Sequence, residues 1–265
     1  MTAIDPVFAG FRLDAKHVPD DVGPTDEERA IRRDLAAAYQ LCARFGWDDL
    51  VYTHISARVP GTADHFLVNP LGLGFDEITA SNLIKIDLDG TIIGEPPDGL
   101  APNAAGFVIH GGIHQVRTDA GCIMHLHTEA QMALSTLECG LLPLTQHAMR
   151  FYGRIGYHEY EGIALSIDER ARFIHDLGDN AALILRNHGT LTVGATVAQA
   201  FVEMYYLEKA ARSQLMAQAT GLPLRQVPLA TIELTANQWS SQLDNGLEWP
   251  AMLRRLDSAG SNYAE

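Results

Sequence analysis

Three histidines in two short motifs are the residues of this chain whose type and spacing best suit metal chemistry. His125 and His127 form a His-x-His pair, and His188 lies in the second motif, Leu-Arg-Asn-His-Gly. Side chains alternate along a strand, so a His-x-His pair on a strand presents both imidazoles on one face. Three protein ligands with an open position are typical of catalytic zinc sites. The pattern predicts a divalent metal ion, with zinc as the first choice and manganese or iron as alternatives, because imidazole suits several ions.

A buried, hydrogen-bonded histidine pair without a metal is the alternative, since the chain holds 11 histidines among 265 residues. The context favours the metal. His125 and His127 follow the apolar pair 123–124, and His188 follows the apolar run 181–185. Both runs are predicted to be short buried strands, and active sites of α/β proteins gather at strand ends.

The predicted elements that position these histidines alternate between strands and helices. The first helix starts at the N-cap Thr25, with Glu28 completing a capping box, and ends at Gly46. Further helices are predicted over 104–117, 129–138, 168–177, 196–219, 232–244 and 249–257. Strands are predicted over 51–59, 65–68, 83–88, 91–93, 121–127, 157–165, 181–186 and 190–193. This order indicates an α/β fold with one layered domain over 25–220, an N-terminal arm over 1–24 and a C-terminal helical extension over 221–265.

Three glycines interrupt the predicted helix 104–117. Gly106, Gly111 and Gly112 should each cost about 1 kcal/mol of helix stability relative to alanine. Their presence indicates that the helix packs closely against a neighbouring element.

Composition excludes several classes of function. The formal net charge of −14 disfavours nucleic-acid binding, because the phosphate backbone would repel the chain. Three cysteines without a CxxC spacing predict no disulfide framework. No apolar run approaches the roughly 20 residues that span a bilayer, and the N-terminus lacks the features of a signal peptide. We therefore expect a cytoplasmic protein that binds neither membrane nor nucleic acid.

Four stretches together resemble the class II aldolase/adducin superfamily over about residues 32–219. They are 53–58 (THISAR), 123–128 (IMHLHT), 139–144 (CGLLPL) and 183–189 (LILRNHG). The third stretch, with 156–163, resembles the adducin head domain more than the sugar-phosphate aldolases. The resemblance implies a three-layer α/β/α sandwich around a mainly antiparallel sheet, often in a homo-tetramer with active sites between subunits. It also implies that His125, His127 and His188 hold zinc or a similar ion.

Two departures from the aldolase pattern concern the chemistry. The aldolases carry a Glu acid/base nineteen residues before the first histidine, and that count lands on Gly106 here. The phosphate-binding residues of the aldolases correspond here to His54 with Ser56, Leu71-Gly72 and Ala104-Ala105. Since a phosphate dianion needs several charge-assisted donors, we expect the substrate to be non-phosphorylated.

The remaining candidate residues are few. Glu129, two residues after His127, is a candidate catalytic carboxylate, or it favours the N-terminus of a helix. His54 is a candidate catalytic residue that could bind a substrate carboxylate, or it serves packing. Ser56 and Gly72 are candidate substrate-binding residues.

These residues leave three functions open. The first is a metal-dependent lyase, performing aldol cleavage or decarboxylation of a small anionic hydroxy, keto or aromatic carboxylic acid. The second is a non-catalytic, adducin-like assembly or partner-binding module, favoured by the missing Glu. The third is an iron-dependent oxygenase that uses the same three histidines.

Overall fold

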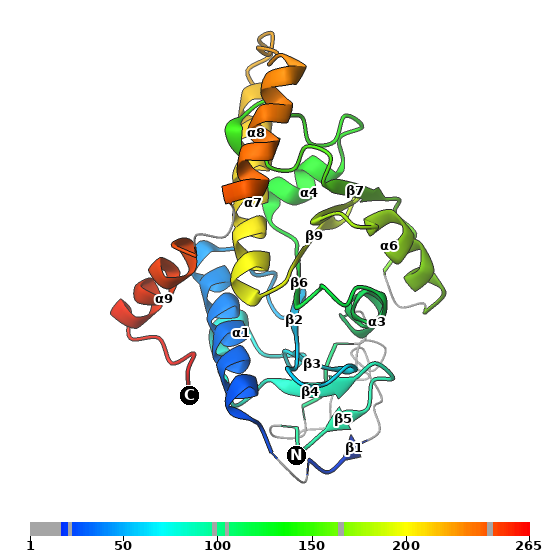
Figure 1. Cartoon of the computed structure of the whole chain (residues 1–265), viewed down its shortest axis with the longest axis vertical. Coiled ribbons are helices and arrows are strands. Elements are labelled where there is room, and N and C mark those ends of the chain that lie inside the picture. The colour runs from blue at the N-terminus through cyan, green and yellow to red at the C-terminus, as the bar shows by residue number, and fades with distance from the viewer. Residues whose placement is uncertain (1–16, 21–22, 97–99, 104–105, 164–166, 243–245) are drawn as a thin grey trace.

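A nine-stranded sheet forms the centre of the protein in the computed structural model, which describes residues 17–20, 23–96, 100–103, 106–163, 167–242 and 246–265 (Figure 1). The strands β1 and β5 pair in parallel, as do β7 and β8, and the other neighbouring strands pair antiparallel. The predicted α/β class with a mainly antiparallel sheet is therefore confirmed. In spatial order the strands are β1 (His17–Val18), β5 (Ile92–Ile93), β4 (Ile84–Asp87), β3 (His65–Val68), β2 (His54–Arg58), β6 (Cys122–Leu126), β9 (Gly189–Gly194), β8 (Ala182–Leu185) and β7 (Ile155–His158).

Helices cover both faces of this sheet. On one face, Met124 of β6 packs in a core with α1 (Asp26–Phe45), α7 (Val197–Gln218) and α9 (Glu248–Ser258). On the other face, the adjacent Ile123 packs with side chains from the segment 107–116 and from α6 (Arg170–Leu177). Successive side chains of a strand point to opposite faces, so the two cores define the predicted three layers.

Three further helices surround α7. They are α4 (Glu129–Ser135), α5 (Gln146–Met149) and α8 (Leu229–Gln242). The helices α4 and α5 contact α7, and α8 lies against α5, so that α8 stands beside α7 at one end of the molecule (Figure 1). No helix in the described ranges is both long enough and apolar enough to cross a membrane.

The first helix begins and ends as its sequence predicts. The Thr25 hydroxyl accepts a hydrogen bond from the Glu28 backbone N–H at 3.1 Å, and Gly46 ends the helix with a left-handed φ of 68°. The Glu28 carboxylate, predicted to complete a capping box, instead bonds Arg32 at 2.9 Å and Lys85 at 3.1 Å. A buried carboxylate gains more from two cations than from one backbone N–H.

The predicted helix 104–117 is a π-helical turn, Phe107–Gly111, followed by α3 (Gly112–Val116). Its glycines do mark close packing. A Cβ at Gly112 would lie 3.0 Å from Cγ of Arg170 in α6, and a Cβ at Gly106 would lie 3.0 Å from Cγ of His54 in β2. Ala104 and Ala105 lie outside the described residues.

One strand was not predicted, and one predicted strand is misplaced. Within the predicted arm, His17–Val18 form β1, which pairs in parallel with β5. The strand predicted over 157–165 instead runs from Ile155 to His158, because Ile155 already pairs with Ala182 of β8.

Candidate metal centre

Strand β6 and the turn before β9 bring His125, His127 and His188 together. One nitrogen from each ring lies within 4.8 Å of the others. His125 is in β6, His127 follows its last residue, and His188 directly precedes β9, which is the antiparallel neighbour of β6. The pairing of two adjacent strands thus gathers histidines that are far apart in sequence.

Hydrogen bonds behind two of these rings fix which nitrogen faces the site. His125 Nδ1 lies 3.0 Å from the Thr190 carbonyl, and His127 Nδ1 lies 2.9 Å from Oδ2 of Asp49. A carbonyl and a carboxylate only accept hydrogen bonds, so both Nδ1 atoms carry the hydrogen. In neutral rings, both Nε2 atoms are then left with lone pairs, as in metal-binding histidines held by an outer carboxylate or carbonyl.

These two lone pairs face each other. The Nε2 atoms of His125 and His127 are 3.0 Å apart, yet with both protons on Nδ1 no hydrogen lies between them. Burial is the main cause that lowers the pKa of His125 well below its ordinary value and the pKa of His188 to about 4. Two acceptors at this distance repel each other unless a cation lies beside both, so the donor set fits a divalent metal ion.

A cavity of about 440 Å³ opens beside the three histidines. None of its described lining residues is a lysine or an arginine. The lining consists of Asp49, Tyr52, Thr53, His54, Asn103, Ile109, His125, His127, Tyr160, Gly162, Ile163, Asn187 and His188. A ligand here would meet imidazoles, hydroxyls and amides rather than fixed positive charge.

Two non-glycine residues of this lining, Thr53 and Asn187, have left-handed backbone, and Thr53 is the more strained because it is β-branched. Its backbone φ is 63°, a left-handed value that is unusual for a β-branched residue and costs roughly 1–3 kcal/mol. Its hydroxyl is buried and has no hydrogen-bond partner among the described residues. A strained backbone and an unsatisfied hydroxyl on a cavity wall are features of ligand-binding sites.

The sequence pattern of the family "Class II Aldolase and Adducin N-terminal domain" matches residues 33–215, more than half of the chain. The chain belongs to this family. The match contains all strands from β2 to β9 in chain order and includes the three histidines.

Relatives with solved structures share this fold over nearly the whole chain. The crystal structure of an aldolase II superfamily protein from Pseudomonas syringae is 46% identical, has a TM-score of 0.85, and covers 91% of this chain and 97% of its own. An L-fuculose 1-phosphate aldolase from Glaciozyma antarctica is 30% identical, has a TM-score of 0.82, and covers 92% of this chain and 97% of its own.

A sequence relative is alpha-adducin of Rattus norvegicus, which is 40% identical over 76% of this chain, corresponding to 27% of that protein.

Of the other predicted site residues, one lines the cavity and three do not. His54 lines the cavity, with its ring centroid 5.1 Å from that of His125. Ser56 is buried and hydrogen-bonds two histidines behind His54, so it does not line the cavity. Glu129 is exposed in the first turn of α4, and Gly72 is exposed on a loop. Neither of these two is among the described residues that line the cavity.

Two residues of the site escaped prediction from sequence. Asp49 lies 78 positions from His127, and no motif links them. His110, on the π-helical turn, lies behind the cavity wall, and its Nε2 is 3.0 Å from His54 Nδ1. For His110 a usable signal existed, because it lies one turn after Gly106, where the aldolases carry their Glu.

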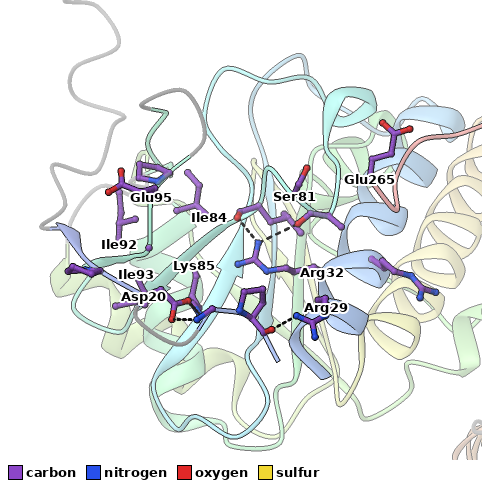
Figure 2. Close-up of a pocket in the computed structure, with 18 of the residues that line it drawn as sticks. Asp20, Arg29, Arg32, Ser81, Ile84, Lys85, Ile92, Ile93, Glu95 and Glu265 are labelled. Carbon is purple, nitrogen blue, oxygen red and sulfur yellow. Dashed lines mark hydrogen bonds and ion pairs between the residues drawn. The ribbon is translucent and has the colours of Figure 1, made fainter. Parts of the chain in front are cut away.

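A second, larger cavity of about 650 Å³ lies between the start of α1 and strands β4 and β5 (Figure 2). Its buried cations are already paired. Lys85 contacts Asp20 at 2.5 Å and Glu28 at 3.1 Å, while Arg32 contacts Glu28 at 2.8 Å and donates to the Leu83 carbonyl. These ion pairs join α1 to β4 and leave Lys85 and Arg32 little capacity for a ligand.

Proposed function

We propose that the chain is a metal-dependent carbon–carbon lyase acting on a small, non-phosphorylated hydroxy, keto or aromatic carboxylic acid. The observation that carries this proposal is the pair of Nε2 lone pairs, 3.0 Å apart, on His125 and His127 beside a cavity. His188 completes the ligand set, with zinc as the first choice of ion and manganese or iron as alternatives.

The cavity lining supports a non-phosphorylated acid. A phosphate dianion needs several charge-assisted donors to offset its desolvation, and no lysine or arginine is among the described lining residues. Gly72, at one position that corresponds to the phosphate site of the aldolases, is not a described lining residue either. A carboxylate with a neighbouring hydroxyl or keto oxygen carries less charge to compensate.

Aldol cleavage and decarboxylation both generate an enolate. A divalent ion held by three neutral imidazoles would keep its full double charge and stabilise that negative charge electrostatically. The chain's own residues orient the site: Asp49 and the Thr190 carbonyl hold the rings of His127 and His125. Tyr160 and Ile163 line the same cavity.

Turnover of small hydroxy and keto acids by the metal-loaded protein tests the proposal directly. The assay follows the release of carbon dioxide or an aldehyde, before and after removal of the metal with a chelator. We expect turnover that disappears with chelation and in His127→Ala, and that persists in His175→Ala, which removes an exposed histidine of α6. A metal-loaded protein that cleaves no acid of this class would contradict the proposal.

Sugar phosphates provide a second test of the substrate class. We expect millimolar fuculose 1-phosphate or ribulose 5-phosphate to leave the melting temperature of the metal-loaded protein unshifted. A clear stabilisation by either compound would show that the site accepts phosphate and that the non-phosphorylated class is wrong.

A non-catalytic, adducin-like module is the second candidate function. Its support is the missing aldolase Glu, replaced by Gly106, together with 40% identity to alpha-adducin. An iron-dependent oxygenase is a third, and the identity of the bound ion separates it from the lyase. For either enzyme we expect a homo-tetramer in the cytoplasm with sites at subunit interfaces, which light scattering of the purified protein tests for the oligomer.

A further inference from the structure

A chain of buried hydrogen bonds runs from the wall of the histidine cavity into the protein interior. His54 Nδ1 lies 3.0 Å from His110 Nε2, and His110 Nδ1 lies 2.7 Å from the Ser56 hydroxyl. The same hydroxyl lies 2.8 Å from His114 Nε2, and His114 Nδ1 lies 3.1 Å from the Ala120 carbonyl. The four side chains are each at most 2% exposed.

The carbonyl at the inner end sets the direction of every bond in this chain. A carbonyl only accepts, so His114 donates from Nδ1 and its Nε2 accepts from the Ser56 hydroxyl. The Ser56 oxygen then accepts from Nδ1 of His110, whose Nε2 accepts from Nδ1 of His54. All three rings are buried, and their hydrogen-bond partners along this chain are imidazoles, a hydroxyl and a carbonyl, with no carboxylate among them, so each ring is neutral and carries one hydrogen. Burial lowers the pKa of His114 to about 3.

His54 is therefore left with a lone pair on Nε2. This atom has no hydrogen-bond partner among the described residues, and His54 lines the cavity beside His125. His54 is not in the group of nitrogens that lie within 4.8 Å of one another, so it stands next to the ligand set rather than in it. Gly106 leaves the space that the ring occupies, since a Cβ there would lie 3.0 Å from His54 Cγ.

Thr53, the residue before His54, also lines this cavity and carries a second unsatisfied polar atom. Its hydroxyl is buried, lacks a partner among the described residues, and belongs to the same cavity wall. The lone pair on His54 is matched by a ligand group that donates a hydrogen bond, even if that group also accepts one. A hydroxyl does both, whereas a carboxylate, a keto oxygen or an ether oxygen only accepts.

We propose that His54 accepts a hydrogen bond from a hydroxyl of the bound ligand, and that the cavity thereby selects hydroxy acids. Ser56, His110 and His114 are positioning residues that hold His54 in the Nδ1–H form. This assignment rests on the proposed metal-dependent function for the acid part of the ligand. It replaces the hypothesis that His54 binds a carboxylate, because a lone pair would repel that group.

The tautomer of His54 is measurable by ¹⁵N NMR of histidine-labelled protein freed of metal, with His54→Phe identifying the signal by its loss. We expect a protonated Nδ1 and an unprotonated Nε2 at His54. Ser56→Ala should mix the two tautomers, whereas Thr192→Val, which also removes one buried hydroxyl, should not. A protonated Nε2 on His54 in the wild-type protein would overturn the proposal, and that result does not require any variant to fold.

Selectivity is tested on the metal-loaded protein with glycolate and its methyl ether, methoxyacetate. We expect glycolate to bind about tenfold more tightly, the effect of one hydrogen bond. His54→Phe should abolish this preference while His175→Ala keeps it. Equal binding of the two acids by the wild-type protein would contradict the proposal. If the protein takes up no metal, the proposed function fails, and the tautomer measured on metal-free protein still decides the role of His54.

Discussion

The two cavities of this protein differ in how completely their polar groups are satisfied. The larger one, at the start of α1, holds Lys85 in contact with the carboxylate of Asp20 (Figure 2). Lys85 and Arg32 both contact the carboxylate of Glu28 as well. The smaller one holds two imidazole lone pairs that face each other, and the Thr53 hydroxyl without a described partner. Volume alone would select the larger cavity, although its buried cations are already paired.

In this protein, unsatisfied buried polar groups indicate a functional site better than cavity volume does. Buried polar groups in folded proteins are normally hydrogen-bonded, so an arrangement that leaves several unsatisfied needs an explanation outside the chain. The proposed cation and hydroxylated acid would supply that explanation for the histidine cavity. Ion pairing between α1 and β4 is sufficient explanation for the other cavity.

Metal addition should give the largest of the expected effects, because only the histidine cavity is expected to bind the ion. We expect zinc, added to chelator-treated protein at about a thousand times its Kd, to stabilise the fold by about 4 kcal/mol, or on the order of 10 °C in melting temperature. His127→Ala should lose this shift and His175→Ala should keep it. An equal shift in both variants would place the bound zinc elsewhere.

Breaking the ion pairs of the larger cavity should destabilise the fold without touching the metal site. Lys85→Met leaves the buried Glu28 with Arg32 alone, and we expect a loss of about 3 kcal/mol in the free energy of unfolding, with unchanged metal content. Urea denaturation measures the loss, and Lys209→Met on α7 is the exposed control. Loss of bound metal in Lys85→Met would show that the two regions are coupled.

Acid should lower the free energy of unfolding through the buried histidines. Folding lowers the pKa of His114 from 6.5 to about 3, so the unfolded chain binds the extra proton between these values. The contribution of His114 to stability is therefore fully present above pH 6.5 and falls below it by about 1.4 kcal/mol per pH unit, or about 2 kcal/mol by pH 5.

Urea denaturation of metal-free protein at pH 7 and pH 5 checks this dependence. His114→Asn should remove its share, whereas Lys85→Met should keep the wild-type slope. Unfolding of the wild-type protein that is independent of pH over this range would refute the role of the buried histidines.

Contact between Gly106 and His54 should give the smallest of these effects. Gly106→Ala crowds the His54 ring and should cost about 1 kcal/mol, and His54→Asn should relieve part of this cost, giving a coupling of about 0.5 kcal/mol. Gly112→Ala, which crowds Arg170 instead, should be additive with His54→Asn. Additivity in both pairs would remove the idea that His54 fills the space left at Gly106.

Local signals explain what the sequence predicts correctly. Thr25 and Gly46 bound α1 because caps act within one turn of the helix, and the His-x-His pair follows from the alternation of a strand. A strand before each histidine motif was also predicted, whereas the pairing of β6 with β9 that gathers the three histidines is a long-range contact.

Long-range contacts explain what the sequence leaves open. Asp49 behind His127, and His110 behind His54, depend on the pairing of β2 with β6 and on the packing of the π-helical turn over β2. Neither contact follows from spacing along the chain. The orientation of the His54 lone pair depends in turn on the Ala120 carbonyl, which only the folded structure places behind His114.

Elemental analysis of the protein, purified without chelator and without a histidine tag, tests the central claim most directly. We predict about one equivalent of zinc, manganese or iron per chain, and none in the folded double variant His125→Ala/His188→Ala. Metal that remains in that variant, or a wild-type protein that binds none even after reconstitution, would contradict the metal site and favour the adducin-like module.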